Sequence, residues 1–423
     1  MSDIAVAGAG LAGLVAARRL AESGHDVTLF EQRDELGGRV RTRTVDGFTC
    51  DRGFQVLFEA YPAVRRELDL DALSLRSFAP GGVICRPGTR STLSDPLRDP
   101  GALLPSALSR EVTLADKLRT LRLRRRLTGG DWPTFDTPDR SIREYLRDAG
   151  FSEAFLDNFA APLYGGITLD RSLSTSANVF EYTFRAMSLG SIVVPAEGMA
   201  AIPAQLAEKA REAGVEMRTG VAVADLDTSG NRVVLDAESG SREFDAAVVA
   251  TDPPTARDLT GVESIPTEGA GVVTQHYRLP GPELDAGTRI MLNAGGEAPN
   301  TVAQLSAVAP EYGDGSDDAL LAASFVDDGA QDRSAEALAK QTREALSSWY
   351  PERDVSGLEP LATDRIPFAQ FAQPPGTHAR LPDVDEPAGR VFLAGDYTRW
   401  SSIQGALESG TRAADAVDGA FDA

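Results

Sequence analysis

Apolar residues near the N-terminus alternate between strand-like and helix-like spacing. Residues 4–7 form a short apolar run, leucine and valine then recur near helical spacing over 11–20, and residues 27–30 are apolar again. This pattern predicts a strand, a helix and a second strand, which together make a βαβ unit. Similar short runs at residues 215–218, 246–250 and 391–394 predict three further strands.

A glycine-rich turn joins the first predicted strand to the first predicted helix. Gly8, Gly10 and Gly13 form G-x-G-x-x-G. The first glycine permits a tight turn, the second lets a pyrophosphate approach the backbone, and the third allows close packing of helix on strand. Leu11 and Ala12 open the helix, whose free N–H groups face the phosphates.

An acidic residue follows the second predicted strand. Glu31, with Gln32 after it, lies about twenty residues beyond the glycines, where its carboxylate accepts hydrogen bonds from ribose hydroxyls. An acid at this place disfavours NADP, but it does not separate NAD from FAD. We therefore expect a Rossmann-type dinucleotide site.

The residues after this acid bear on the choice between NAD and FAD. Gly37, Gly38 and Arg39 follow Glu31 in the arrangement E-x5-GGR. Here the chain resembles the superfamily of flavin amine oxidases, protoporphyrinogen oxidases and phytoene desaturases. The resemblance implies that this loop crosses the pyrophosphate of FAD and that the arginine supplies a positive charge beside it.

The C-terminal end resembles the same superfamily independently. Residues 391–396 form an apolar strand that ends in Gly395 and Asp396, and residues 402–410 open the last predicted helix. The resemblance implies that the acid lies near the ribityl chain and that the helix N-terminus points at the flavin pyrimidine ring. A helix N-terminus there stabilises the negative charge of the reduced flavin. The cofactor-binding residues expected in this helix are Ile403, Gln404 and Ala406.

Shorter pieces of resemblance lie between the two ends. The segment 51–55 lies where members of the superfamily bring a glycine segment under the isoalloxazine ring. Residues 195–199 resemble the desaturase pattern P-x-G-G-M, but Glu197 stands where glycine is common. That departure leaves the role of the loop open. Residues 53–57 and 162–174 are most like the phytoene desaturase-like branch. The expected cofactor contacts from these pieces are Gly53, Phe54, Val221 near adenine, Ala250 and Thr251.

The domain organisation follows from changes along the chain. Residues 77–187 are rich in proline, arginine and helical spacing, with capping boxes at Thr113 and Ser141, while residues 269–375 combine a strand-like run at 271–279 with a helix over 334–350. We predict an α/β fold with a Rossmann-like FAD-binding domain of discontinuous segments and an inserted α+β substrate-binding domain. The FAD-binding segments are 1–76, 188–268 and 376–423, and the substrate-binding segments are 77–187 and 269–375.

Composition excludes several classes. With 63 acidic and 42 basic residues the formal charge is −21, which repels nucleic acid. The two cysteines and three histidines have no metal-ligand spacing, so no metal is expected. No apolar run reaches the roughly 20 residues of a membrane span, and no charged leader is present. We expect a cytoplasmic protein, and the excess of acidic residues is compatible with a salt-adapted cytoplasm.

The expected reaction is hydride transfer from an apolar substrate. Many amine oxidases of the superfamily hold a lysine near flavin N5, whereas the lysines here (117, 209 and 340) fall in charged helical contexts. No Gly-x-Cys attachment pattern occurs near the C-terminus, so FAD should be noncovalent. We expect a desaturase or dehydrogenase of an isoprenoid or carotenoid-like substrate, with O2 or a quinone as electron acceptor and no assigned catalytic side chain. The alternatives are an amine or protoporphyrinogen oxidase, a redox-neutral carotenoid isomerase, and a flavin-bearing protein without catalysis.

Two further sets of residues bear on an apolar substrate. Five aromatic residues are candidates for lining a tunnel, although residues of this kind belong more often to the core: Phe54, Tyr164, Phe368, Phe371 and Trp400. A basic stretch at 117–126 interleaves arginine with leucine after the Thr113 capping box. It predicts either a helix that docks transiently on an anionic membrane or a solvated helix paired with the chain's own carboxylates.

Overall fold

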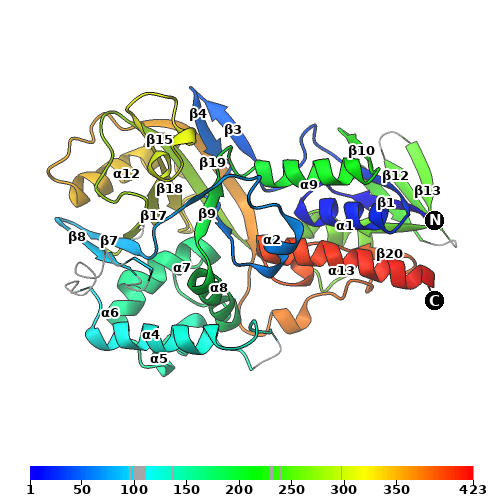
Figure 1. Cartoon of the computed structure of the whole chain (residues 1–423), viewed down its shortest axis with the longest axis horizontal. Coiled ribbons are helices and arrows are strands. Elements are labelled where there is room, and N and C mark those ends of the chain that lie inside the picture. The colour runs from blue at the N-terminus through cyan, green and yellow to red at the C-terminus, as the bar shows by residue number, and fades with distance from the viewer. Residues whose placement is uncertain are drawn as a thin grey trace.

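The computed structural model describes residues 1–94, 98–99, 111–135, 138–228, 232–237, 240–296 and 298–422 of the 423-residue chain. Figure 1 shows an elongated molecule with both termini at one end. A parallel sheet forms that end, and a mainly antiparallel sheet with a group of helices forms the other. The predicted α/β fold class is confirmed.

The first sheet has five parallel strands in the order β10-β2-β1-β14-β20. All five were predicted from short apolar runs, and each lies within one residue of the predicted bounds. The bounds are Asp3–Ala7 (β1), Asp26–Glu31 (β2), Glu216–Thr219 (β10), Ala246–Val249 (β14) and Val391–Leu393 (β20). The central strands are apolar almost throughout because both faces of a parallel sheet are covered.

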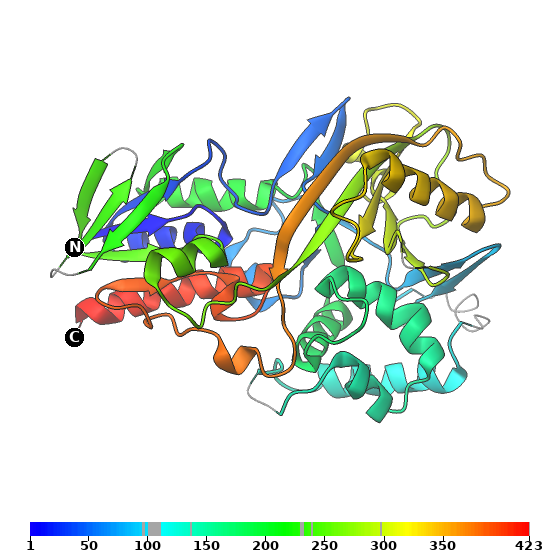
Figure 2. The ribbon, with the colours of Figure 1, turned by 180° about the vertical axis from the view of Figure 1, so that it is seen from behind.

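Helices α1 (Leu11–Glu22), α9 (Ala201–Glu212) and α13 (Ile403–Asp422) cover one face of this sheet, with α1 between the other two (Figure 1). The α1 and α13 backbones approach closely at Gly410, where a Cβ would overlap the carbonyl oxygen of Ala12. The opposite face is visible in Figure 2. It is covered by α10 (Pro253–Thr260) and by the small sheet of β11 (Val223–Asp227), β12 (Val233–Ala237) and β13 (Gly240–Phe244).

The second sheet has seven strands in the order β19-β15-β18-β17-β16-β7-β8. Helix α12 (Ala335–Trp349) packs on one face, and the side chain of Ser334 caps it by accepting a hydrogen bond from the Ala337 N–H. The predicted strand at 271–279 and helix at 334–350 are confirmed. The strand bounds are Gly82–Arg86 (β7), Thr89–Leu93 (β8), Gly269–Leu279 (β15), Ile290–Asn293 (β16), Thr301–Gln304 (β17), Ala319–Phe325 (β18) and Glu359–Phe371 (β19).

A helical group packs beside the second sheet. Both predicted capping boxes are present: Thr113 caps α4 and Ser141 caps α5. The bounds are Leu114–Thr128 (α4), Ile142–Asp148 (α5), Glu153–Phe155 (α6), a π-helical turn at Leu156–Ala160, Ala161–Thr168 (α7) and Ala177–Leu189 (α8).

Short elements connect the two ends of the molecule. They are β3 (Thr42–Val45), β4 (Phe48–Asp51), β5 (Leu57–Phe58), α2 (Pro62–Glu67), β6 (Leu75–Ser77), β9 (Ile192–Pro195), α11 (Leu305–Val308) and the 3-10 turns Pro310–Tyr312, His378–Arg380 and Asp396–Thr398. The strands of the parallel sheet come from segments 1–76, 188–268 and 376–423, and those of the seven-stranded sheet from 77–187 and 269–375. We propose these segments as the two domains; parts of 77–187 (95–97, 100–110 and 136–137) lie outside the described residues.

The loop at 195–199 has a structural role that the sequence left open. Gly198 has φ +90°, and a Cβ there would lie 2.5 Å from the Thr42 side chain, so this position requires glycine. Glu197 is exposed and needs no special backbone conformation. The backbone at position 197 therefore accepts a residue other than glycine.

The leucines of the basic helix α4 lie on two sides of the helix, and only some of them are exposed. Leu123, one of the leucines interleaved with the arginines of the stretch 117–126, is buried and cannot contact a membrane. Leu114, Leu118 and Leu121 lie on the outer face, with exposed fractions of 72%, 60% and 39%. No helix within the described residues is long and apolar enough to cross a membrane.

Candidate cofactor site and neighbouring pocket

The predicted cofactor residues gather at the carboxyl edge of the five-stranded sheet. Gly8 follows β1, Glu31 ends β2, Ala250 follows β14 and Gly395 follows β20. The carboxyl ends of parallel strands are where open α/β sheets bind ligands. The topology therefore places these distant parts of the sequence at one edge.

The three glycines of the first turn have different structural requirements. Gly8 has φ +105°, and a Cβ there would lie 2.6 Å from the carbonyl oxygen of Ala250. A Cβ on Gly13 would overlap the carbonyl oxygen of Gly8. Around Gly10, in contrast, nothing lies within 4 Å of the Cβ position. The fold itself requires Gly8 and Gly13, whereas Gly10 leaves a space open for a ligand.

The N-terminus of α1 is suited to an anion. Gly10 is the N-cap residue and provides no side-chain cap, so the first N–H groups, at Leu11, Ala12 and Gly13, have no side-chain acceptor. Leu11 and Ala12 are buried. An uncapped, buried helix N-terminus is stabilised by an anionic group such as a pyrophosphate.

Glu31 is buried beside this turn. One carboxylate oxygen accepts a hydrogen bond from the Ala9 N–H at 2.9 Å and the other from the Arg33 N–H at 3.0 Å. The Val221 N–H donates to the Glu31 carbonyl oxygen at 2.9 Å, which brings these two predicted residues together. Each carboxylate oxygen keeps lone-pair capacity for a further donor such as a ribose hydroxyl. The neighbouring Gln32 is exposed.

The loop with Gly37 and Gly38 lies against the glycine turn. The Gly37 N–H donates to the Ala9 carbonyl oxygen at 2.8 Å, and both glycines have positive φ values, +113° and +61°. A Cβ on Gly38 would lie 3.1 Å from the Cα of Gly10. A side chain at Gly38 would therefore crowd the Gly10 turn, whereas a Cβ at Gly37 would lie 2.6 Å from the Val40 carbonyl oxygen.

Arg39 and Asp396 join the two ends of the chain. Their guanidinium and carboxylate groups form an ion pair at 2.8 Å, and the Ser401 hydroxyl donates to the same carboxylate at 2.9 Å. Burial alone would lower the pKa of Arg39, but the charge of Asp396, with its hydrogen bond, and the charge of Asp252 raise that pKa above its ordinary value. Arg39 thus remains positively charged. Its guanidinium pairs with Asp396 and can also attract a phosphate nearby.

The segment with Gly53 and Phe54 connects the cofactor edge to the second sheet. The Phe54 N–H donates to the Thr274 hydroxyl on β15 at 3.1 Å, and the Gln55 amide donates to the Arg39 carbonyl oxygen at 3.0 Å. The Gln55 Oε1 atom is buried and has no hydrogen-bond partner. A buried acceptor of this kind fits a ligand that donates a hydrogen bond. Sequence reasoning included Gln55 in the phrase 51–55 but did not name it as a contact.

The N-terminus of α13 has free backbone donors. Ser402 accepts hydrogen bonds from the N–H groups of Gly405 and Ala406, and the N–H groups of Ile403 and Gln404 have no partner among the described residues. The Gln404 side chain accepts a hydrogen bond from the Ala63 N–H at the start of α2. A cofactor contact at Gln404 would therefore come from its backbone.

Thr251 lies beside the glycine turn. The Ala250 N–H donates a hydrogen bond to the Ala7 carbonyl oxygen. The Thr251 hydroxyl donates to the carbonyl oxygen of the next residue, Asp252, at 3.4 Å. Asp252 caps α10 and acts electrostatically on Arg39. Sequence reasoning missed Asp252 as part of this charge network, although it follows Ala250 and Thr251 directly.

The structure does not bring the five tunnel candidates together. Phe371 is buried behind the nucleotide sheet with Tyr397, and Phe368 packs on the same cluster. Tyr164 packs on Phe180, with ring centroids 4.8 Å apart. Trp400 lines a cavity of about 690 Å³. These contacts place Tyr164, Phe368 and Phe371 in core clusters, and a tunnel lined by any of the candidates stays a prediction.

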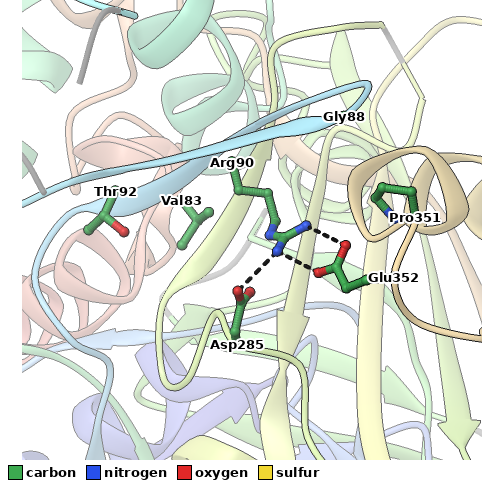
Figure 3. Close-up of a pocket in the computed structure, with 7 residues that line it drawn as sticks. All are labelled: Val83, Gly88, Arg90, Thr92, Asp285, Pro351 and Glu352. Carbon is green, nitrogen blue, oxygen red and sulfur yellow. Dashed lines mark hydrogen bonds and ion pairs between the residues drawn. The ribbon is translucent and has the colours of Figure 1, made fainter. Parts of the chain in front are cut away.

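That cavity lies beside the loop that leads into α13. It is lined by the loop at 132–135, by α8, by residues 376–383 and by α13 itself. A smaller pocket of about 280 Å³ lies at the edge of the second sheet, where Arg90 pairs with Asp285 and Glu352 (Figure 3). The charged side chains of this pocket are thus paired with one another. The described residues contain no cluster of histidine, cysteine or acidic residues that could hold a metal.

Comparison with known proteins places this geometry in a family. Residues 11–418 match the sequence model of the family of flavin containing amine oxidoreductases. The chain belongs to this family. It is thus a flavin-dependent oxidoreductase, and the open turn at Gly10, the uncapped α1 and the buried Gln55 acceptor fit a bound dinucleotide.

Two relatives in sequence are a dehydrogenase and a desaturase. A phytoene dehydrogenase of Streptomyces griseus is 30% identical over 298 residues, which cover 62% of this chain and 56% of the relative. A 4,4'-diapophytoene desaturase of Staphylococcus haemolyticus is 48% identical over 66 residues, 15% of this chain and 13% of the relative. The matched regions therefore span little more than half of one relative and a small part of the other.

Solved structures share the fold of this family member. A structure of putrescine oxidase bound to putrescine has a TM-score of 0.73 at 19% identity, and the match covers 99% of each chain. At this identity the likeness shows the fold alone.

Proposed function

We propose that the flavin is noncovalently bound FAD at the carboxyl edge of the parallel sheet. Glu31 would hold the adenosine ribose, the α1 N-terminus the pyrophosphate, and the α13 N-terminus the pyrimidine end of the flavin. The two cysteines are buried on β4 and β7. Burial raises the pKa of the Cys50 thiol to about 12, so it stays protonated and a poor nucleophile for flavin attachment.

We further propose that the enzyme desaturates an apolar isoprenoid or carotenoid-like substrate. The observation that carries this proposal is the 30% identity to a phytoene dehydrogenase over 298 residues. The flavin, when bound, accepts a hydride from the substrate carbon. The chain supplies orientation, exclusion of water, and the α13 N-terminus, whose partial positive charge stabilises a negatively charged reduced ring.

The positions of the lysines favour desaturation over amine oxidation. Lys209 on α9 donates to the Glu67 carbonyl oxygen, Lys340 on α12 is exposed, and Lys117 lies on α4. The chain has three lysines, and all three are outside the cofactor edge. A lysine beside flavin N5, as in many amine oxidases, is therefore unavailable here.

Product analysis separates the remaining alternatives. A candidate polyene precursor is incubated anaerobically with the oxidised enzyme, and the extracted product is weighed by mass spectrometry. Desaturation gives a product lacking two hydrogen atoms. An unchanged mass with altered double-bond geometry would support the redox-neutral isomerase, and reaction of an amine or porphyrinogen alone would support the corresponding oxidase.

We propose that the cytoplasmic enzyme obtains its apolar substrate by transient contact of α4 with an anionic membrane. The outward stripe of Leu114, Leu118 and Leu121 supports this docking because an interfacial helix inserts such residues between the acyl chains. Arg122 and Arg125 flank the stripe, are exposed and form no ion pair with described residues. Arg119 and Arg126, in contrast, pair with Asp116 and Glu181.

Liposome flotation tests the contact. The wild type is expected to float with anionic vesicles at low salt and less at high salt, because salt screens the attraction of Arg122 and Arg125 to the headgroups. The double variant Arg122→Gln/Arg125→Gln should lose at least half of the floating fraction without losing flavin. A matched control, Arg211→Gln/Lys340→Gln, removes two charges elsewhere and should float normally. A wild type that stays in solution at every ionic strength would refute the docking.

A further inference from the structure

The cavity beside the α13 loop is walled by aromatic rings that the cofactor edge does not use. Trp132, Phe135, Tyr182 and Trp400 line it. The Trp132 and Tyr182 ring centroids are 4.8 Å apart, and those of Tyr182 and Trp400 are 5.0 Å apart. Its volume of about 690 Å³ falls within the usual range for small-molecule sites. Such a wall favours a flat, conjugated ligand because rings stack on rings.

The polar groups of the cavity nearly balance in charge. Three carboxylates (Asp139, Asp383 and Glu408) face two arginines (Arg399 and Arg412). Arg399 pairs with Glu408 at 2.8 Å, and Asp139 accepts hydrogen bonds from the Ser176 hydroxyl and the Gly376 N–H. Burial lowers the pKa of His378 to about 4, so the imidazole is neutral at pH 7. A neutral ligand fits this balance better than a dinucleotide with its charged pyrophosphate.

One hydroxyl in the cavity lacks a partner. Tyr182 lines the cavity and is 7% exposed as a residue, and its hydroxyl forms no hydrogen bond with any described residue. Burial raises the pKa of Tyr182, and the charge of Glu408 raises it further, so the group keeps its proton and can donate. The hydroxyl oxygen itself is not fully buried and stays open to the cavity, where a ligand carbonyl oxygen can accept its hydrogen bond.

The cavity is next to the cofactor edge. Trp400 forms its wall, and the following residue, Ser401, donates to the Asp396 carboxylate that pairs with Arg39. On the cavity side, Gln373 accepts hydrogen bonds from the Ser401 N–H at 2.9 Å and from His378 Nε2 at 3.2 Å. One short loop thus separates the cavity from the residues expected to hold the flavin.

We propose that this cavity binds a quinone, with its ring against Trp132 and Tyr182 and one carbonyl oxygen accepting from the Tyr182 hydroxyl. As electron acceptor, a role that rests on the proposed function, the quinone takes up the two electrons and one proton that the flavin received as hydride. A second proton from solvent completes the quinol.

Intrinsic fluorescence of the holoenzyme tests binding, because two of the three tryptophans, Trp132 and Trp400, line the cavity and Trp349 lies in the other core. A water-soluble benzoquinone is expected to quench emission saturably. Trp132→Phe should lose much of the saturable quenching, and Trp349→Phe should keep it. Linear quenching without saturation, or equal loss in both variants, would overturn the site.

The hydroxyl is tested by the variant Tyr182→Phe, which keeps the ring. Quinone affinity measured by equilibrium dialysis should fall roughly three- to tenfold, as for the loss of one hydrogen bond. Tyr145→Phe is the matched control, since the Tyr145 hydroxyl bonds to Glu181 outside the cavity. Equal affinity in the wild type and Tyr182→Phe would contradict the assigned contact.

The acceptor role has its own test. Enzyme with photoreduced flavin is mixed anaerobically with the benzoquinone, and flavin absorbance is followed. Reoxidation should saturate with quinone and should need more quinone in Tyr182→Phe. Reoxidation by O2 alone would refute the acceptor role. Because photoreduction needs no substrate, this result is independent of the proposed desaturation.

Discussion

Replacing Gly10 by alanine is expected to leave the protein folded but to weaken FAD binding by about 1–3 kcal/mol, the usual cost of inserting a methyl group into a filled space. Nothing lies within 4 Å of the Cβ position at Gly10, and its φ of −73° suits any residue. The added methyl therefore disturbs only a ligand that occupies this space. Thermal unfolding of the apoprotein and titration with FAD measure the two effects separately.

Two other glycines provide the contrast. Gly13→Ala should lower the melting temperature of the apoprotein itself, because the new Cβ overlaps the Gly8 carbonyl oxygen. Gly419→Ala, at an open position in α13, should change neither stability nor affinity by much. If Gly10→Ala binds FAD as the wild type does, the pyrophosphate lies elsewhere.

Replacing Glu31 by alanine is expected to weaken FAD binding by about 1.5–3 kcal/mol, the range for hydrogen bonds to a charged group. If FAD is held noncovalently, as proposed, acid should release it unaltered from the yellow protein and leave apoprotein for the titration. Flavin that stays with the precipitate would contradict noncovalent binding.

The Glu31 effect needs a conservative control, because its carboxylate also accepts hydrogen bonds from Ala9 and Arg33. Glu31→Gln keeps one acceptor oxygen for these groups. It should fold as the wild type does and retain part of the affinity. Unchanged affinity in Glu31→Ala would make Glu31 a structural acid at the end of a strand.

The cofactor edge could be predicted from sequence because its signals are local. Gly8, Gly13 and Glu31 are constrained by one turn and two strands, and the apolar runs gave all five strands of the sheet. The alternation of apolar runs with helical spacing likewise indicated the α/β class. The motif at Gly395 and Asp396 was found for the same reason, as a strand followed by a helix start.

The aromatic cavity could not be predicted because tertiary packing creates it. Trp132, Tyr182 and Trp400 come from three distant segments, and no spacing in the sequence relates them. Helix α4 shows the same limit. Leucines occur on two sides of it, and packing on α8 decides that Leu123 is buried while Leu118 is exposed.

The central claim is that the flavin takes a hydride directly from an apolar polyene. The direct measurement is the absorbance of the oxidised flavin when the holoenzyme is mixed anaerobically with liposomes that carry a phytoene-like precursor. The account predicts bleaching of the flavin in step with formation of a product that lacks two hydrogen atoms. A flavin that stays oxidised with this precursor but bleaches with an amine would contradict the account.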